Sequence, residues 1–312
     1  MNKVNNNLSR RKFLGITTAA AGLAMVSWEN GISAASGFQS SGKPNSRFGG
    51  VQVGAITYSW RSMPGTPEDI VRYCQQTGIS SIELMGDVAE KYAGIPGGKE
   101  GSKERLEWRL AAPLNKYKEL RKMFNDAGVK IHIAKFSPAN WTEAEIDYSF
   151  KAAKALGAIG VCNEIGDDAC EKMGPIAKSN GMVAIFHNHL QPGEPGWSFE
   201  KFLDYSPANM LNFDAGHYYG ATGLHPNGII EKLHKRIVSI HVKDKTGPKD
   251  TPANTNMTWG EGKTPISDIL LLIKKNKWPI YVDIELEYPV PEGSDAVAEV
   301  RKCVEYCRKI LA

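Results

Sequence analysis

The sequence lacks the cysteine patterns of small metal-binding and redox domains. Its five cysteines include no CxxC pair, and the closest two, Cys303 and Cys307, are separated by three residues. This spacing excludes a zinc ribbon and a thioredoxin-type motif. An odd number of cysteines, with the closest pair one helical turn apart, predicts buried thiols rather than a disulfide framework.

Long apolar runs and an excess of charge are also missing. The apolar stretch at residues 16–26 is too short to span a bilayer, so we expect no stable membrane insertion. Residues 1–35 hold four basic side chains against one acidic one, a net of +3, which leaves +1 of the formal +4 for the rest of the chain. A nearly neutral body lacks the basic surface that nucleic-acid binding requires, so we expect no nucleic-acid partner.

The first residues carry most of the positive charge in one short motif. Ser9-Arg10-Arg11-Lys12-Phe13-Leu14-Gly15 precedes the apolar stretch, and small residues follow at 33–35. This order resembles a twin-arginine export signal. We therefore expect a signal peptide at residues 1–35, a polar linker at 36–48, one domain at 49–312, and a periplasmic or otherwise exported protein.

Apolar, β-branched runs alternate with amphipathic stretches along the rest of the chain. The eight predicted strands are residues 51–59, 80–85, 129–136, 158–164, 182–188, 210–214, 237–242 and 280–285. The eight predicted helices are residues 67–77, 103–127, 143–156, 167–180, 199–204, 228–234, 266–276 and 295–311. Strict alternation of this number favours a (β/α)8 TIM barrel in a single domain. No glycine-rich phosphate motif follows the first strand, which disfavours a dinucleotide-binding sheet.

Potential metal ligands gather where the later strands end. In a TIM barrel these carboxyl ends meet at one rim, which carries the active site. Four of the seven histidines fall at three such ends. The strand-end segments are Asn163-Glu164, His187-Asn188-His189, Asp214-Ala215-Gly216-His217, His241-Val242-Lys243-Asp244 and Glu285-Leu286-Glu287.

Four segments carry a resemblance to a known family. LNFDAGHYYG, IVSIHVKDK, TWGEGKTPI and VDIELEY occur in this order. Together they resemble the sugar phosphate isomerase/epimerase family with the xylose-isomerase-like barrel, over residues 51–310. The resemblance implies one divalent metal ion, Mn, Co, Zn or Mg, bound by Asp214, His241 and Glu285. At the fourth position the family has a glutamate, and here His187 aligns with it, which gives two imidazoles and two carboxylates.

The change at His187 bears on proton transfer. In the family's epimerases the corresponding glutamate also moves protons, so another group must do so here, or the reaction must differ. Glu164 and His189 are the candidate acid and base, because both end strands close to His187. Lys243 lies two residues beyond His241, and we expect its cation to face the developing oxyanion.

The remaining candidates are substrate-binding residues. Lys135 and His217 lie at strand ends, and Trp60 and Trp259 follow strands where an indole could stack on a sugar ring. For each of them a structural role is an open alternative. Glu83, on the second predicted strand, could bind substrate or stabilise the barrel.

The combined interpretation is a metal-dependent sugar isomerase or epimerase. It would act on a keto-sugar or glycoside through proton abstraction next to a carbonyl and an enediolate. A keto-glycoside lyase or dehydratase using the same site is one alternative, and a non-catalytic carbohydrate-binding barrel is another. The expected partner is a small carbohydrate, and a homo-oligomer is compatible with the sequence.

Overall fold

Eight parallel strands close into a barrel in the structure, a computed structural model that describes residues 42–112 and 114–312. The barrel closes because β2 pairs with β11 on one side and with β3 on the other. The barrel strands are β2 (Val51–Ile56), β3 (Ser81–Met85), β4 (Lys130–Lys135), β5 (Gly160–Glu164), β6 (Val183–His187), β7 (Asn209–Asp214), β8 (Ile237–Val242) and β11 (Tyr281–Ile284). The predicted single-domain TIM barrel is confirmed. The expected signal peptide and residues 36–41 of the expected linker lie outside the described residues.

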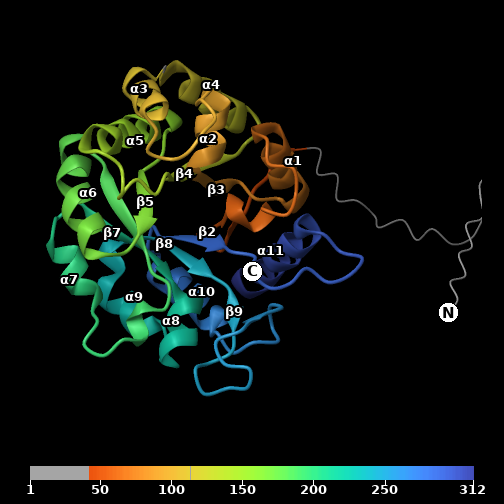
Figure 1. Ribbon diagram of the computed structural model, residues 1–312. Coiled ribbons are helices and arrows are strands. Elements are labelled where there is room, and N and C mark those ends of the chain that lie inside the picture. Colours follow the sequence, from red (N-terminus) through yellow and green to blue (C-terminus); the bar gives the residue numbers. More distant parts are fainter. Residues whose placement is uncertain (1–41, 113) are drawn as a thin grey trace, which may run out of the picture. The chain divides into compact units, whose positions relative to one another are not determined.

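Helices surround the strands (Figure 1). They are α1 (Pro67–Thr77), α2 (Gly86–Ala93), α3 (Lys103–Ala111), α4 (Leu114–Asp126), α5 (Glu143–Leu156), α6 (Asp167–Ser179), α7 (Phe199–Asp204), α8 (Ala215–Thr222), α9 (Asn227–Leu233), α10 (Ile266–Asn276) and α11 (Ala296–Leu311). Short 3-10 helices are η1 (Thr57–Trp60), η2 (Gln191–Gly193) and η3 (His234–Arg236), and the short strands are β1 (Arg47–Phe48), β9 (Asp244–Lys245) and β10 (Asn256–Met257). Within the described ranges, no helix has the length and apolar character needed to cross a membrane.

Local sequence explains most helix boundaries. Capping boxes begin α1 and α5: Thr66 and Thr142 each accept a hydrogen bond from the backbone N–H three residues later, and the carboxylate of that later residue accepts one from the threonine's backbone N–H. The long helix predicted at 103–127 is wrong, because it is divided into α3 and α4. Ala112 adopts an extended conformation ahead of the proline that follows it, as residues before proline prefer. The short helices α2 and α8 were not predicted.

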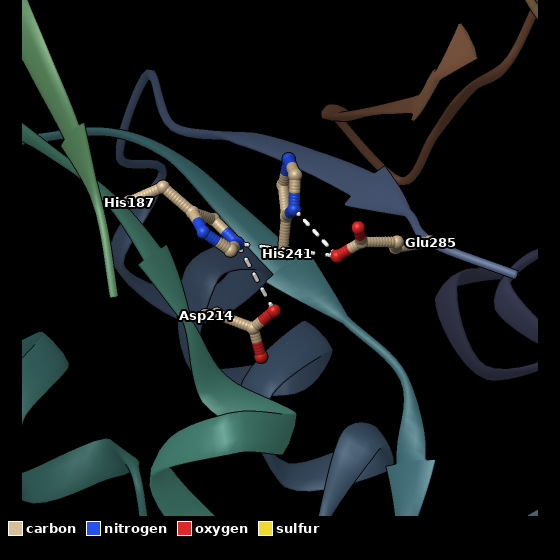
Figure 2. A group of neighbouring side chains, drawn as sticks. All are labelled: His187, Asp214, His241 and Glu285. Carbon is tan, nitrogen blue, oxygen red and sulfur yellow. Dashed lines mark hydrogen bonds and ion pairs between the residues drawn. The ribbon is translucent and has the colours of Figure 1, made fainter. Parts of the chain in front are cut away.

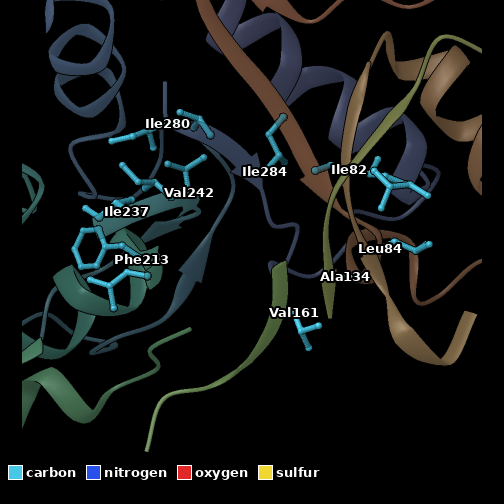
Figure 3. Close-up of a cluster of buried hydrophobic side chains, with 14 of the residues drawn as sticks. Ile82, Leu84, Ala134, Val161, Phe213, Ile237, Val242, Ile280 and Ile284 are labelled. Carbon is cyan, nitrogen blue, oxygen red and sulfur yellow. The ribbon is translucent and has the colours of Figure 1, made fainter. Parts of the chain in front are cut away.

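Alternation along the strands separates two environments. Figure 3 shows apolar strand side chains, including Phe213, Val242 and Ile284, in the core. Their neighbours Asp214, His241 and Glu285 belong to the polar group at the rim of the barrel. Successive side chains of a strand point to opposite faces of the sheet. A polar residue next to one that packs in the core outside the barrel therefore faces the barrel axis.

A buried arginine joins the helices on one side of the barrel. The side chain of Arg109 on α3 is fully buried, and it donates hydrogen bonds to Glu90 of α2, at 2.8 and 3.1 Å, and to Glu145 of α5, at 3.0 Å. Its guanidinium carbon lies 3.4 Å from the ring centroid of Trp141. The side chains of Glu90 and Glu145 are themselves buried, and among the described residues Arg109 is the cation with which they form ion pairs.

Replacing Arg109 by Met should therefore lower the free energy of unfolding by about 3–5 kcal/mol, since two buried carboxylates lose their counter-charge. Urea titration followed by circular dichroism measures the change. Arg105→Met is the matched control, because Arg105 pairs with the half-exposed Glu100 and should cost no more than about 1 kcal/mol. Equal destabilisation by the two substitutions would contradict this account of Arg109.

Candidate active site

Four predicted metal ligands meet at the carboxyl ends of the last four barrel strands. His187 ends β6, Asp214 ends β7, His241 lies one residue before the end of β8, and Glu285 directly follows β11. Each is at most 6% exposed. These strands are neighbours in the barrel, in the order β11, β8, β7 and β6, so adjacent strand ends bring the four side chains together.

The facing atoms of these residues, here called the metal cluster, lie within 4.8 Å of one another. Figure 2 shows the side chains directed toward a common centre. His187 Nε2 lies 3.2 Å from Asp214 Oδ2 and 3.9 Å from Glu285 Oε2, and His241 Nδ1 lies 2.9 Å from Glu285 Oε2. Two imidazole nitrogens and two carboxylate oxygens at this separation form a donor set suited to one divalent ion.

Each of the two imidazoles contacts a carboxylate through the ring nitrogen that faces away from the metal cluster. Glu164 Oε2 lies 3.1 Å from His187 Nδ1, and Glu83 Oε2 lies 2.7 Å from His241 Nε2. When these outer nitrogens carry the protons, His187 Nε2 and His241 Nδ1 present lone pairs to the cluster. Carboxylates behind metal-bound histidines commonly fix the tautomer and the ring orientation in this way.

The charges of the cluster perturb its protonation. Burial disfavours the imidazolium of His241, but Glu83 and Glu285 outweigh this and hold its pKa well above the ordinary value. Burial likewise opposes ionisation of Asp214, but the nearby Lys243 and His217 hold the pKa of that carboxyl well below its usual range. The carboxylates are therefore ionised and able to bind a cation.

Lys243 contacts the same carboxylate oxygens. Its Nζ lies 2.9 Å from Asp214 Oδ2, 2.7 Å from Glu285 Oε2 and 2.7 Å from Glu287 Oε2. The ammonium group is buried, and although burial alone would lower the pKa of Lys243, these carboxylates raise it. Three carboxylates thus share this one ammonium group.

Glu164 connects the metal cluster to two further basic groups. Its Oε1 accepts a hydrogen bond from Lys135 Nζ at 2.6 Å, and its Oε2 lies 2.8 Å from His189 Nε2. Burial would raise the pKa of Glu164, but Lys135, His187 and His189 together hold it well below the usual range. Glu164 is therefore a carboxylate that orients neighbouring cations and imidazoles. His189 is 47% exposed at its side chain and open to a ligand.

These groups line a cavity of about 200 Å³, here called the metal-site cavity. Its lining is Ile56, Tyr58, Met85, Lys135, Glu164, His187, His189, His241, Glu285 and Glu287. A divalent ion held by the metal cluster would polarise a carbonyl compound bound in this cavity, and the Glu164–His189 pair lies where it can exchange a proton with that compound.

The structure brings some of the predicted substrate-binding residues to this region and not others. Lys135 lines the metal-site cavity. His217 does not line this cavity, but its Nε2 lies 3.7 Å from Oε2 of Glu287, which does. Burial lowers the pKa of His217 to about 4, so it is neutral at pH 7. Trp60 is only 2% exposed and packs on Tyr73, and Trp259 packs on Tyr306, so neither ring lines the metal-site cavity.

Three polar residues of the site were left unassigned or were not identified from the sequence. Glu83 was left undecided and contacts His241. Glu287, expected at the rim, pairs with Lys243. Asn212 was missed, and its Nδ2 lies 3.0 Å from His241 Nε2 and 2.7 Å from Glu83 Oε2. Asn212 lies two residues before Asp214 on β7, so the alternation of the strand would have placed it on the same inner face.

Comparison with known proteins agrees with this architecture. Residues 71–310 match the family described as the xylose isomerase-like TIM barrel. An inosose dehydratase of Clostridium beijerinckii is 30% identical over 80 residues, a match that covers 25% of this chain and 26% of that protein. The chain thus matches about a quarter of the length of this relative.

Solved structures show the same fold at low sequence identity. A sugar phosphate isomerase/epimerase from Parabacteroides distasonis superposes with a TM-score of 0.61 and 18% identity, covering 84% of this chain and 96% of that one. The IOLI protein with a bound zinc atom gives a TM-score of 0.57 and 14% identity, covering 84% and 99%. The family match covers most of the chain, and the chain belongs to the xylose isomerase-like TIM barrel family.

Proposed function

We propose that this protein is a metal-dependent isomerase or epimerase of a keto-sugar or keto-glycoside. The observation that carries the proposal is the metal cluster next to the Glu164–His189 pair in one cavity. His187, Asp214, His241 and Glu285 would hold a divalent ion, and that ion would supply a Lewis acid able to polarise a carbonyl oxygen and acidify the neighbouring C–H. The zinc atom in the IOLI protein supports metal binding in this fold.

His189 is the proposed proton-transferring group. Its ring is half-exposed at the cavity, and Glu164 accepts a hydrogen bond from Nε2–H and stabilises the imidazolium that forms when the ring takes a proton. Lys135 keeps Glu164 ionised for this purpose. Lys243, held by Glu287, presents a fixed positive charge to the enediolate oxygen.

A dehydratase is the second candidate function. The matched relative is named an inosose dehydratase, and elimination begins with the same proton abstraction next to a carbonyl. Glu287, which lines the metal-site cavity next to the neutral His217, is a further polar group that a departing hydroxyl could contact. A non-catalytic carbohydrate-binding role has less support, because the rings of Trp60 and Trp259 do not line the metal-site cavity.

Deuterium exchange tests the proposed reaction. Incubation of the manganese-loaded protein with a panel of keto-sugars and keto-glycosides in D₂O should place deuterium on the carbon next to the carbonyl of the substrate that turns over. Mass spectrometry detects the label, and loss of water in the same spectrum identifies the dehydratase. Turnover without deuterium in substrate or product would contradict exchangeable proton abstraction.

Lys243 should compete with the metal ion, because its ammonium contacts Asp214 Oδ2 and Glu285 Oε2. Lys243→Met should tighten the binding of Mn²⁺ by about tenfold, the effect of one lost charge-assisted contact. It should also lower the melting temperature of the metal-free protein, since buried carboxylates lose their cation. Isothermal titration calorimetry and thermal unfolding measure the two effects.

Lys245→Met is the matched control for Lys243→Met. Lys245 lies two residues after Lys243 and is buried to a similar degree. Unlike Lys243, it forms no ion pair with a carboxylate of the described residues. We expect its removal to change manganese affinity by no more than about twofold. Unchanged or weaker binding in Lys243→Met would show that the two cations do not compete.

We also propose that the protein is exported through the twin-arginine route, on the strength of Arg10-Arg11 ahead of Phe13-Leu14. Changing both arginines to lysine should retain the protein in the cytoplasm, because the charge is kept and only the recognised pair is lost. Cell fractionation and immunoblotting measure the distribution. Undiminished export of the double variant would contradict the proposal.

A further inference from the structure

A second cavity adjoins the metal-site cavity. It has a volume of about 330 Å³ and shares Tyr58 and Met85 with the metal-site cavity. Here it is called the side cleft, and its lining is Thr57, Tyr58, Trp60, Arg61, Met63, Pro64, Gly65, Ile70, Met85, Asp87, Val88 and Lys91. It lies between η1 and the start of α1 on one side and α2 on the other. The two cavities therefore meet at Tyr58 and Met85, here called the common wall.

Hydrogen bonds hold this common wall in place. Thr57 Oγ1 accepts a hydrogen bond from the backbone N–H of Met85 at 3.0 Å, which ties η1 to the end of β3. Ser59 Oγ donates to the carbonyl of Ile284 at 3.2 Å and accepts from the N–H of Leu286 at 3.0 Å. The side cleft is thus formed before any ligand binds, which reduces the cost of ordering it on binding.

Arg61 fixes the aromatic ring at the junction. Its Nη1 donates to the carbonyl of Leu286 at 2.7 Å, and its guanidinium carbon lies 4.5 Å from the ring centroid of Tyr58. Tyr58 is nevertheless 40% exposed, so part of its ring is available to a ligand. A fixed and partly exposed ring between two cavities is suited to contact a molecule that extends from one into the other.

The lining of the side cleft is mixed. Tyr58, Trp60, Met63 and Met85 supply aromatic rings and thioethers, and Arg61, Asp87 and Lys91 supply charged groups. Trp60 adds one polar group, because its Nε1 is buried without a hydrogen-bond partner among the residues that the structure describes. Aromatic faces beside polar groups suit a ring that also carries oxygen atoms.

Volume limits what the metal-site cavity can hold. Ligand pockets typically occupy about 300–1,000 Å³, and the metal-site cavity of about 200 Å³ lies below this range, whereas the two cavities together lie within it. We propose that the side cleft binds the second ring of a two-ring glycoside whose keto-sugar ring lies in the metal-site cavity. This assignment of substrate class rests on the proposed function, since it places the reacting ring at the metal cluster.

Binding of two simple glucosides tests the side cleft without turnover. Phenyl β-glucoside and methyl β-glucoside are titrated calorimetrically into the manganese-loaded full chain. Phenyl β-glucoside should bind about tenfold more tightly or better, because its ring buries apolar surface in the side cleft. Val88→Phe should fill the side cleft, abolish this preference and leave the affinity for methyl β-glucoside unchanged.

Ile159→Phe is the matched control, because Ile159 is exposed just before β5, at the opposite end of the barrel strands. It should retain the preference of the unmodified protein, and thermal unfolding should show both variants folded. Equal affinities for the two glucosides, no binding of phenyl β-glucoside, or a preference that survives Val88→Phe would each overturn the assignment. This test measures binding and not turnover, so its result is independent of the proposed reaction. If phenyl β-glucoside is preferred but no deuterium exchange is found, the side cleft is supported as a binding site and the proposed reaction is contradicted.

Discussion

Asp214→Asn should weaken manganese binding on the order of 100-fold and reduce turnover at limiting metal by a similar factor. Asp214 Oδ2 faces His187 Nε2 at 3.2 Å, so the substitution removes a charged oxygen from the centre of the metal cluster. Asparagine keeps an oxygen able to accept the hydrogen bond that Asp214 Oδ1 receives from the backbone of His217 at 2.6 Å. The N-terminal cap of α8 is therefore retained, and the metal effect is separated from folding.

Asp244→Asn is the control for the loss of one buried carboxylate. Asp244 is also nearly buried and lies three residues beyond His241, but it accepts hydrogen bonds from the backbone N–H groups of Gly260, Gly262 and Thr264. Its substitution should leave manganese affinity within about twofold of the unmodified protein. An equal loss of manganese affinity in Asp214→Asn and Asp244→Asn would contradict the assignment of Asp214 as a metal ligand.

Glu164→Gln and His189→Asn should each lower kcat on the order of 100-fold at saturating metal, the usual contribution of a positioned acid or base. Their effects on metal affinity should differ. Glu164 accepts a hydrogen bond from His187, so its loss should also weaken metal binding by about 10- to 100-fold. His189 contacts Glu164 and lies outside the metal cluster, so His189→Asn should leave metal affinity unchanged.

Steady-state kinetics across a metal titration separates these effects. A rise in KM with unchanged kcat would assign the residue to substrate binding instead of proton transfer. Weaker metal binding in His189→Asn than in Glu164→Gln would contradict the arrangement in which Glu164 stands between His189 and His187.

Strand geometry predicted the rim where the metal cluster lies, and the resemblance to the family selected its four residues from the polar side chains gathered there. Parallel strands bring their carboxyl ends to one rim, and His187, Asp214, His241 and Glu285 all occur at predicted strand ends. The alternation of apolar and polar residues then determines which side chains face inward. These features are local in sequence, so they could be predicted without knowledge of how the loops pack.

Features that depend on packing between distant segments could not be predicted in the same way. Trp60 follows a strand, and its burial depends on Tyr73 of α1, with which its ring makes contact. The three carboxylates around Lys243 come from β7 and from the residues after β11, and only the closed barrel brings them together. The helices α2 and α8 begin at the residues directly after β3 and β7, so no loop separates them from the strands in the sequence.

Anomalous diffraction from crystals grown with Mn²⁺ tests the central claim most directly. The account predicts one peak in the anomalous difference map, at about 2.0–2.3 Å from His187 Nε2, Asp214 Oδ2, His241 Nδ1 and Glu285 Oε2. The same map from crystals of Asp214→Asn should show a weakened peak or none. A map without a peak at the metal cluster, or with its peak between Glu164 and His189, would contradict the account.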